Sequence, residues 1–208
     1  MGHASGAGAA AGVPATQILV VRHGQSEWNA LGLWQGQEDP PLTELGRSQA
    51  LEAAASVGSV DAVFASPLQR ASETASIVAE QLGVGPVIEL PGLMERHAGE
   101  WQGCTRAEIE RDWPGYLAAG RRPPSWEDDG LVEQRAMDSL HAIASGCPGG
   151  NVLAVAHAGI IYAIERTLEV RFQKVANLSG PALVHHGGGV TMGERVHLIA
   201  HETVPEQI

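Results

Sequence analysis

The sequence predicts an α/β fold, in which an open and mostly parallel β-sheet is the middle of three layers and helices cover both of its faces. Three apolar runs, at 18–21, 60–65 and 151–156, have the length and composition of buried strands. Each run leads to a polar residue and then to a stretch of helical character. Strands that alternate with helices favour parallel pairing, because parallel neighbours need a crossover connection.

The composition limits the class of protein. At 208 residues, with 44% hydrophobic and 18% charged residues, the chain is typical of one soluble globular domain. We expect that domain over residues 16–208, after a mobile Ala/Gly-rich tail over residues 1–15. The tail lacks the basic start of a signal peptide, and no apolar run reaches the ~20 residues that span a bilayer. We therefore expect a cytoplasmic protein without a membrane partner.

The formal net charge of −11 argues against a nucleic-acid partner, because the chain has no basic stripe. A site for a phosphate dianion must therefore gather its few cations locally. The two cysteines, Cys104 and Cys147, form neither a disulfide framework nor a metal motif. The C-terminal histidines also lack the spacing of metal ligands, so we expect neither a metal nor another cofactor.

The first strand leads directly into Arg22, His23 and Gly24. In an open α/β sheet, ligands bind beyond the carboxyl ends of the strands. A histidine there is a good covalent nucleophile for phosphoryl groups, and an arginine is a good bidentate phosphate clamp. Gly24 allows the backbone to turn sharply and to approach a ligand closely. The strand end therefore predicts a phosphate site.

Residues 22–29, Arg-His-Gly-Gln-Ser-Glu-Trp-Asn, resemble the signature of the histidine phosphatase superfamily, the phosphoglycerate mutase-like proteins. The resemblance extends over nearly the whole chain, from Ile18 to His201. It implies that His23 is the catalytic nucleophile and that Arg22 is a catalytic residue that also binds the phosphate. It favours the phosphatase branch of the superfamily.

Residues 24–42 are a long loop rich in glycine and proline, and loops of this length usually have a function. Residues 34–46 resemble the family's second conserved stretch, which lies over the phosphate and the substrate. The resemblance implies that this region supplies three substrate or phosphate contacts, namely Asn29, Gln35 and Gly36. Thr43 predicts a helix N-cap, with the helix extending to about residue 57.

The strand over 60–65 precedes a predicted helix start. Ser66 has the character of an N-cap, Pro67 that of a first helical residue, and Gln69 would complete a capping box. This places Arg70 in the first turn of a helix, where anions are favoured. Residues 66–75 resemble the family context of a second phosphate-binding arginine. The resemblance implies that Arg70 is catalytic and binds phosphate.

A third short strand is expected over 87–90. Residues 93–103 resemble the family stretch whose glutamate donates a proton to the leaving oxygen, and Glu95 matches that glutamate. Arg96 beside it has two interpretations. It could contact a phosphate or carboxylate of the substrate, or it could be a solvated arginine next to an acid.

Residues 104–130 contain one expected helix, at 106–113, and are then broken repeatedly by proline and glycine. The resemblance implies a small cap insertion that governs substrate choice, and its shortness favours a phosphatase over a mutase. Arg121 and Arg122 either reach an anionic substrate or are solvated. Glu127 matches the glutamate of a family Gly-Glu-Ser motif, while Trp126 and Asp128 stand where that motif has glycine and serine.

A helix is expected over 131–145, and the strand at 151–156 then delivers His157 and Ala158 to a helix at 160–168. The family's second histidine lies in such a context, which implies that His157 is catalytic and that both residues contact phosphate. Because the strand ends share one edge of the sheet, the side chains that follow them should converge. The C-terminal region predicts a hairpin with strands at 190–192 and 195–200 around a turn at 193–194.

Together these features favour a metal-independent hydrolase that acts on a small-molecule phosphomonoester through a phosphohistidine intermediate. Two alternatives stay open. One is a cofactor-dependent phosphoglycerate mutase, and the other is a protein that binds a phosphate ligand without turnover. The sequence leaves the identity of the phosphomonoester open, and also the oligomeric state, for which a homodimer is one option.

Overall fold

The computed structural model describes residues 14–187 and 189–200, and most of the expected N-terminal tail lies outside them. Six strands form one sheet in the order β3-β2-β4-β1-β5-β6. The first four of these pair in parallel, and β5 and β6 are added in antiparallel fashion. The strands are β1 (Thr16–Arg22), β2 (Ala62–Ala65), β3 (Ile88–Glu89), β4 (Asn151–Ala156), β5 (Ser179–His186) and β6 (Gly189–His197).

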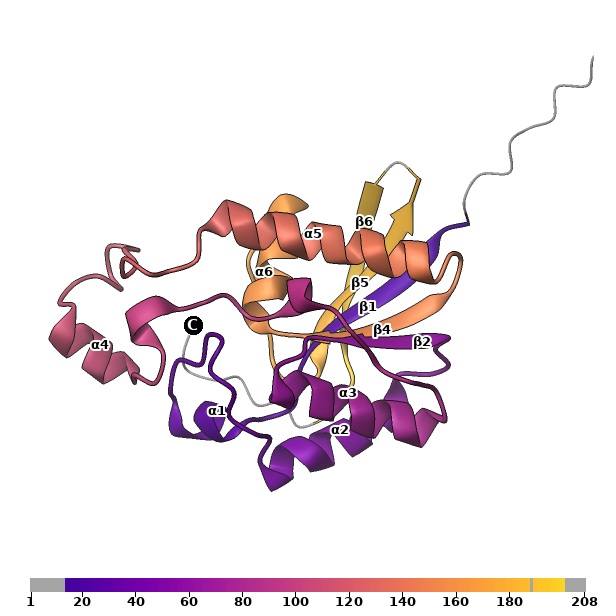
Figure 1. Cartoon of the computed structure of the whole chain (residues 1–208), viewed down its shortest axis with the longest axis horizontal. Helices are drawn as coiled ribbons and strands as arrows, with labels where there is room; N and C mark the ends of the chain where they lie inside the picture. Colours follow the sequence, from indigo (N-terminus) through magenta and orange to yellow (C-terminus); the bar gives the residue numbers. More distant parts are fainter. Residues whose placement is uncertain (1–13, 188, 201–208) are drawn as a thin grey trace, which may run out of the picture.

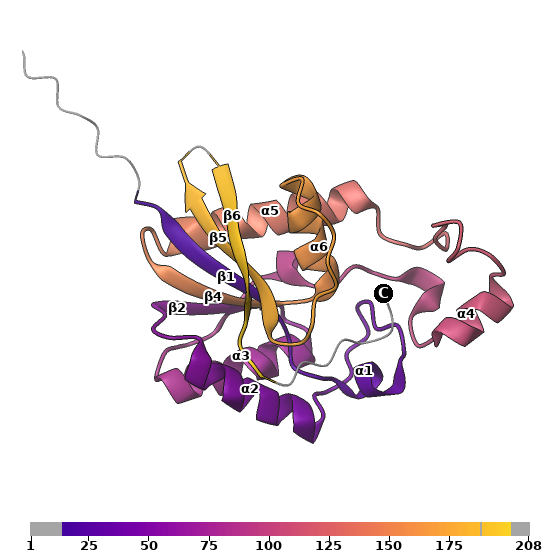
Figure 2. The same ribbon diagram turned by 180° about the vertical axis from the view of Figure 1, so that it is seen from behind.

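Helices cover both faces of this sheet, as Figures 1 and 2 show from opposite sides. One face is covered by α2 (Glu44–Ser56) and α3 (Gln69–Leu82), and the other by α5 (Asp129–Gly146) and α6 (Ala158–Thr167). Alternate residues of β1 supply the two cores, because successive side chains of a strand point to opposite faces. Val20 packs with α5 and α6, whereas Val21 packs with α2 and α3. The predicted three-layer α/β fold is therefore confirmed.

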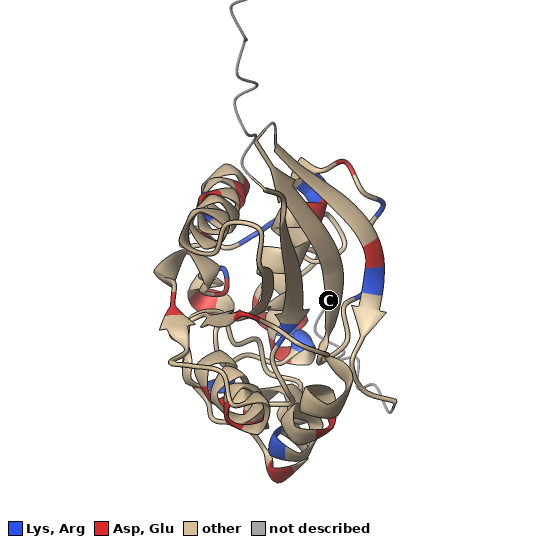
Figure 3. Cartoon of the chain, turned by 90° about the vertical axis from the view of Figure 1, so that its right-hand side faces the viewer, with Lys and Arg blue, Asp and Glu red and all other residues tan. Residues whose placement is uncertain are grey.

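The segment between the third strand and α5 extends to one side of the sheet (Figure 1). It contains two short 3-10 turns and one helix: Pro91–Leu93, Gly99–Trp101 and α4 (Arg106–Asp112). Charged residues lie mostly on helices and loops, while the central strands are largely uncharged (Figure 3). Within the described residues, none of the helices has the length and apolar character needed to cross a membrane.

The start of α3 differs from the prediction. The helix begins at Gln69 with Leu68 at its N-cap position, and Leu68 has an extended backbone without a capping side chain. The predicted capping box of Ser66 and Gln69 is therefore wrong. The Gln69 N–H instead donates to Asp39 Oδ1 at 2.6 Å, so a carboxylate from the preceding loop satisfies the helix start. Arg70 still lies in the first helical turn, as predicted.

The C-terminal hairpin also differs. The strand β6 runs unbroken through Gly193 and Glu194, and its hairpin partner is β5, which had not been expected. The predicted turn at 193–194 is wrong, because the register shifts there: Pro181 pairs with Arg195, and Leu183 pairs with Met192. Two residues of β6 thus face one residue of β5, which is the geometry of a β-bulge. A further helix missed by the sequence, α1 (Glu27–Leu31), lies within the long loop.

The interior face of α5 should contribute strongly to stability. Leu140 is fully buried there, whereas Leu131 on the same helix is 60% exposed. We expect Leu140→Ala to lower the free energy of unfolding by about 2–5 kcal/mol, since it removes apolar contacts and leaves a cavity. Leu131→Ala should change it by no more than about 0.5 kcal/mol. Urea unfolding of both variants measures this, and equal losses would contradict the described packing of α5.

Candidate active site

The ends of β1 and β4 and the start of α3 bring the predicted residues together at one edge of the sheet. Arg22 ends β1, His23 follows it, and His157 lies between β4 and α6. All of these side chains, together with Arg70, are buried. The rings of His23 and His157 meet edge to face, with centroids 5.1 Å apart. The predicted convergence of the three strand ends is therefore present in the structure.

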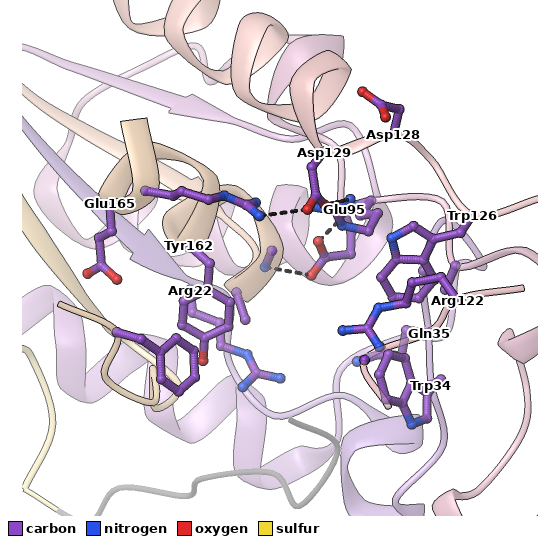
Figure 4. A pocket seen from close by; sticks show the side chains of 18 of the residues that line it. Arg22, Trp34, Gln35, Glu95, Arg122, Trp126, Asp128, Asp129, Tyr162 and Glu165 are labelled. Carbon is purple, nitrogen blue, oxygen red and sulfur yellow. Dashed lines mark hydrogen bonds and ion pairs between the residues drawn. The ribbon is translucent and has the colours of Figure 1, made fainter. Parts of the chain in front are cut away.

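A cavity of about 950 Å³ opens beside these residues. Arg22, His23, Arg70 and Glu95 line it, while His157 lies against His23 behind the lining. Figure 4 shows the guanidinium of Arg22 pointing into this space. The volume greatly exceeds that of a phosphate group, so the cavity has room for the rest of a small ligand.

The hydrogen bonds of His23 define its reactive nitrogen. Its Nδ1 lies 2.6 Å from the Gly24 carbonyl oxygen, which can only accept, so Nδ1 carries the proton. In the neutral ring the lone pair is then on Nε2. The main chain of His23 is fixed as well: its N–H donates to Ala156 O, and its carbonyl accepts from Asn177 Nδ2 at 2.7 Å. Sequence reasoning missed Asn177, because its side chain meets His23 only through the tertiary fold.

Both histidines are held in their neutral form. Burial lowers the pKa of His23 well below its ordinary value, and the charges of Arg70 and Arg22 lower it further. Burial and Arg70 act in the same direction on the pKa of His157. The Nε2 of His157 shares a 2.8 Å hydrogen bond with Ser66 Oγ, and its buried Nδ1 has no partner among the described residues. Ser66 thus contacts His157, and its Oγ also accepts from the N–H of Leu68, the N-cap residue of α3, at 3.2 Å.

The two buried arginines are anchored by main-chain carbonyls. Arg70 donates to Glu38 O at 2.7 Å and to Gly36 O at 2.8 Å, and Arg22 donates to Val175 O at 3.2 Å. The buried Nε of each arginine has no partner among the described residues. Burial lowers the pKa of Arg70 to about 10, so the side chain keeps its charge at neutral pH. An anion in the cavity would supply the partner that these buried cations lack.

Glu95 also lines the cavity, and its carboxylate lies against the first turn of α6. Its Oε1 accepts from the Arg96 N–H at 2.7 Å, and its Oε2 accepts from the Gly159 N–H at 3.1 Å, near the start of α6. A Cβ atom added at Gly159 would lie only 2.0 Å from Glu95 Oε1. Only glycine at this position lets the carboxylate approach the helix so closely.

The remaining predicted contacts divide into two groups. Gln35, Gly36 and Ala158 line the cavity, whereas Asn29 is not among its lining residues. The Oδ1 of Asn29 accepts from the Ser26 N–H at 3.3 Å, as part of the capping box that begins α1. Ser26 in turn donates to Gln35 Oε1 at 2.7 Å. Asn29 is therefore positioned to support the loop that carries Gln35 rather than to line the cavity itself.

The structure also separates the arginines whose roles the sequence left open. Arg122 lines the cavity and lies over the ring of Trp126, 5.0 Å from its centroid. Arg121 instead lies over Tyr116 and donates to its hydroxyl at 2.9 Å. In Figure 4, Arg122 points into the cavity from the side opposite Arg22.

Arg96 is a buried residue rather than a solvated one. It pairs with Asp129 Oδ1 at 2.5 Å and donates to Glu127 O at 2.7 Å. The second oxygen of Asp129 pairs with Arg166 of α6 at 2.7 Å. Arg96 thus belongs to a network of charges on the cavity wall, and its charge is partly balanced before any ligand binds.

The comparisons with known proteins agree with this geometry. The model of the histidine phosphatase superfamily (branch 1) matches residues 18–183. The chain belongs to this superfamily. In enzyme class it is a histidine phosphatase, a phosphoric monoester hydrolase.

Two curated relatives and one solved structure illustrate the similarity. A metal-independent phosphoserine phosphatase of Arabidopsis thaliana is 37% identical over 159 residues, covering 72% of this chain and 67% of the relative. A glucosyl-3-phosphoglycerate phosphatase of Mycobacterium tuberculosis is 33% identical over 169 residues, covering 74% and 75%. A mycobacterial glucosyl-3-phosphoglycerate phosphatase in complex with VO3 superposes with a TM-score of 0.76 at 29% identity, covering 85% of this chain and 96% of the other.

The buried histidines should make stability fall at mildly acidic pH. An unfolded histidine has a pKa near 6.5, whereas the folded pKa of His23 and of His157 is lower. Below about pH 6.5 the unfolded chain therefore binds more protons, and stability falls with decreasing pH by up to about 1.4 kcal/mol per pH unit for each histidine. Urea unfolding between pH 7.5 and 5.5 should show a shallower decline for His157→Gln. The exposed His186→Gln is the control, and a slope unchanged by His157→Gln would contradict the burial effect.

Proposed function

We propose that the protein hydrolyses a small phosphomonoester in two steps, through a phosphohistidine at His23 and without a metal. The observation that carries the proposal is the state of His23. Its Nδ1–H is bound to Gly24 O, its pKa is lowered by burial, and two buried arginines lie beside it. A neutral imidazole with its lone pair on Nε2 is the form that attacks phosphorus.

In the first step, Nε2 of His23 forms a bond to phosphorus and the bond from phosphorus to the leaving oxygen breaks. Glu95 gives a proton to that oxygen, so an alcohol departs. In the second step, Glu95 takes a proton from water, the resulting oxygen attacks phosphorus, and the bond from nitrogen to phosphorus breaks. Free phosphate and neutral His23 result.

Positive charge for both steps comes from Arg22 and Arg70. Each is held by main-chain carbonyls and leaves a buried Nε–H without a partner among the described residues. Donors fixed in this way before the reaction stabilise the charge that develops on the phosphoryl oxygens. This charge supports a reaction without a metal ion. His157, in contact with both the His23 ring and Ser66, supports the same site from behind.

The test is phosphate release from a panel of phosphomonoesters that includes 3-phosphoglycerate and phosphoserine, with and without EDTA. We expect wild-type activity to survive EDTA and His23→Ala to abolish it. Arg70→Ala should lower kcat/KM by about 10²–10³-fold, the cost typical of one lost charge-stabilising donor. Rapid acid-free quenching of labelled substrate should trap label on wild-type protein but not on His23→Ala.

The control is His186→Ala, an exposed position on the distant hairpin. Activity retained by His23→Ala, or lost on addition of EDTA, would contradict the proposed mechanism. Isomerised phosphoglycerate with little free phosphate would support the mutase alternative instead. Binding of phosphate without turnover on any ester would support a role in ligand binding.

The cavity also favours a leaving group that carries a carboxylate. The named substrates of the two relatives, phosphoserine and glucosyl-3-phosphoglycerate, both contain one. In this chain, Arg122 extends over Trp126 into the cavity opposite Arg22, and no ion pair is found for it among the described residues. A guanidinium in that position suits a carboxylate at the far end of the substrate.

Removing Arg122 should therefore weaken the binding of substrates that carry a carboxylate. We expect Arg122→Ala to raise KM for 3-phosphoglycerate or phosphoserine about 10-fold or more, because a hydrogen bond between charged groups is lost. KM for glycerol 3-phosphate, which has no carboxylate, should change little. Arg121→Ala is the matched control, since Arg121 contacts Tyr116 and does not line the cavity. Equal effects on both kinds of substrate would argue against carboxylate recognition.

A further inference from the structure

Arg135, in the second turn of α5, holds the main chain on which Glu95 is carried. Its Nη1 donates to Gly92 O at 2.9 Å and also to Met94 O, and its Nη2 donates to Glu95 O at 3.2 Å. One side chain thus satisfies three carbonyls within four residues of sequence. Arg135 itself does not line the cavity.

Glu127 fixes Arg135 from the other side. Its carboxylate accepts from Arg135 Nε at 2.8 Å and from Nη2 at 3.0 Å, which is a two-point ion pair. The same carboxylate accepts from the His97 N–H at 2.9 Å, and the Glu127 N–H donates to His97 O at 3.0 Å. The ion pair therefore binds the chain before Glu95, at Glu95 itself and two residues after it.

The segment around Glu95 depends on these contacts because it has little regular structure. After the 3-10 turn Pro91–Leu93, residues 94–97 belong to no helix or strand. Main-chain carbonyls in such a segment need partners from elsewhere. Arg135 provides one for Gly92, Met94 and Glu95, and the Glu95 carbonyl also accepts from Gln37 Nε2 at 3.0 Å. The segment also lies tightly against α5, since a Cβ atom at Gly92 would be 2.8 Å from Arg135 O.

We propose that the Arg135–Glu127 ion pair is a positioning device for Glu95, and that it sets how well Glu95 protonates the leaving oxygen. This rests on the proposed role of Glu95 as the proton donor. Proton transfer needs the donor within hydrogen-bond distance of the oxygen, and a misplacement of 1 Å can cost about 100-fold in rate. The phosphate-facing residues, Arg22, His23 and Arg70, receive no hydrogen bond from Arg135.

The test compares two leaving groups. An alkyl phosphate such as 3-phosphoglycerate needs a proton on its departing oxygen, whereas p-nitrophenyl phosphate releases a stable phenolate. We expect Arg135→Gln and Glu127→Gln to lower kcat/KM for the alkyl ester by about 10²-fold, within the range that general acid catalysis contributes. The kcat/KM for p-nitrophenyl phosphate should fall less than about threefold. Because kcat/KM covers only the steps up to departure of the alcohol, the later attack of water does not enter the comparison.

Three reference variants make the result specific. Glu95→Gln should show the same dependence on the leaving group, and Arg135→Lys should restore part of the alkyl activity because the lysine keeps the charge. Arg47→Gln is the matched control: Arg47 pairs with Glu44 and Glu73 between α2 and α3, outside the cavity lining. Arg47→Gln should change kcat/KM for neither ester. If Arg135→Gln fails to fold by circular dichroism, Glu127→Gln and Arg135→Lys carry the same comparison.

The outcomes separate two failures. If Glu95→Gln affects the two esters equally, the proposed role of Glu95 is wrong. If Glu95→Gln is selective for the alkyl ester but Arg135→Gln and Glu127→Gln lower both esters equally, or neither, the positioning proposal is overturned while the proposed function stands. Inhibition by inorganic vanadate should be unchanged in the Arg135 and Glu127 variants, and a large loss of vanadate affinity would also overturn the proposal.

Discussion

Two guanidinium groups, those of Arg22 and Arg70, are buried at the carboxyl edge of the sheet without a carboxylate partner among the described residues. Burying a charge in this way is unfavourable unless hydrogen bonds or a counter-ion compensate. Main-chain carbonyls of Gly36, Glu38 and Val175 supply part of that compensation. The loops that carry these carbonyls must therefore close over the strand ends, and the shape of the cavity follows from that closure.

The positive charge of the site contrasts with the net charge of the whole chain. The protein has a formal net charge of −11, yet several of its few cations face one cavity. Five arginines and five acidic residues line this cavity, so the wall as a whole carries both signs of charge. Within the cavity the compensation is graded. Arg96 and Arg166 share Asp129, whereas Arg22 and Arg70 each keep an Nε–H without a partner in the part of the chain that the structure describes. The unbalanced charge is thus localised where His23 lies.

The sequence predicted what depends on local pattern. Apolar runs followed by polar residues located Arg22, His23 and His157, and the shared edge of parallel strands predicted their convergence. Contacts between segments that are distant in the sequence could not be predicted from it. Nothing near Asn177 or Arg135 in the sequence indicates that one meets the carbonyl of His23 and the other that of Glu95. Such bonds are made only when the sheet and α5 have formed.

Other differences between prediction and structure arose where one sequence pattern is compatible with two local structures. Gly193 and Glu194 fit a hairpin turn as well as a bulge, and only the pairing of β6 with β5 decides between them. Ser66 and Gln69 fit a capping box, but the hydroxyl of Ser66 contacts His157. The same hydroxyl accepts from the Leu68 N–H at 3.2 Å, so Ser66 serves the site and the turn before α3 together.

The indole rings beside the cavity have a separate consequence. Trp34, Trp101 and Trp126 meet edge to face, with ring centroids 5.3–5.8 Å apart, and Arg122 lies over two of them. They come from the long loop, from the segment after Glu95 and from the end of the cap. Aromatic rings in fixed packing give near-ultraviolet circular dichroism, which disappears when the packing loosens. The near-ultraviolet signal therefore reports the contact between the cap and the long loop, and it can be measured before any substrate is known.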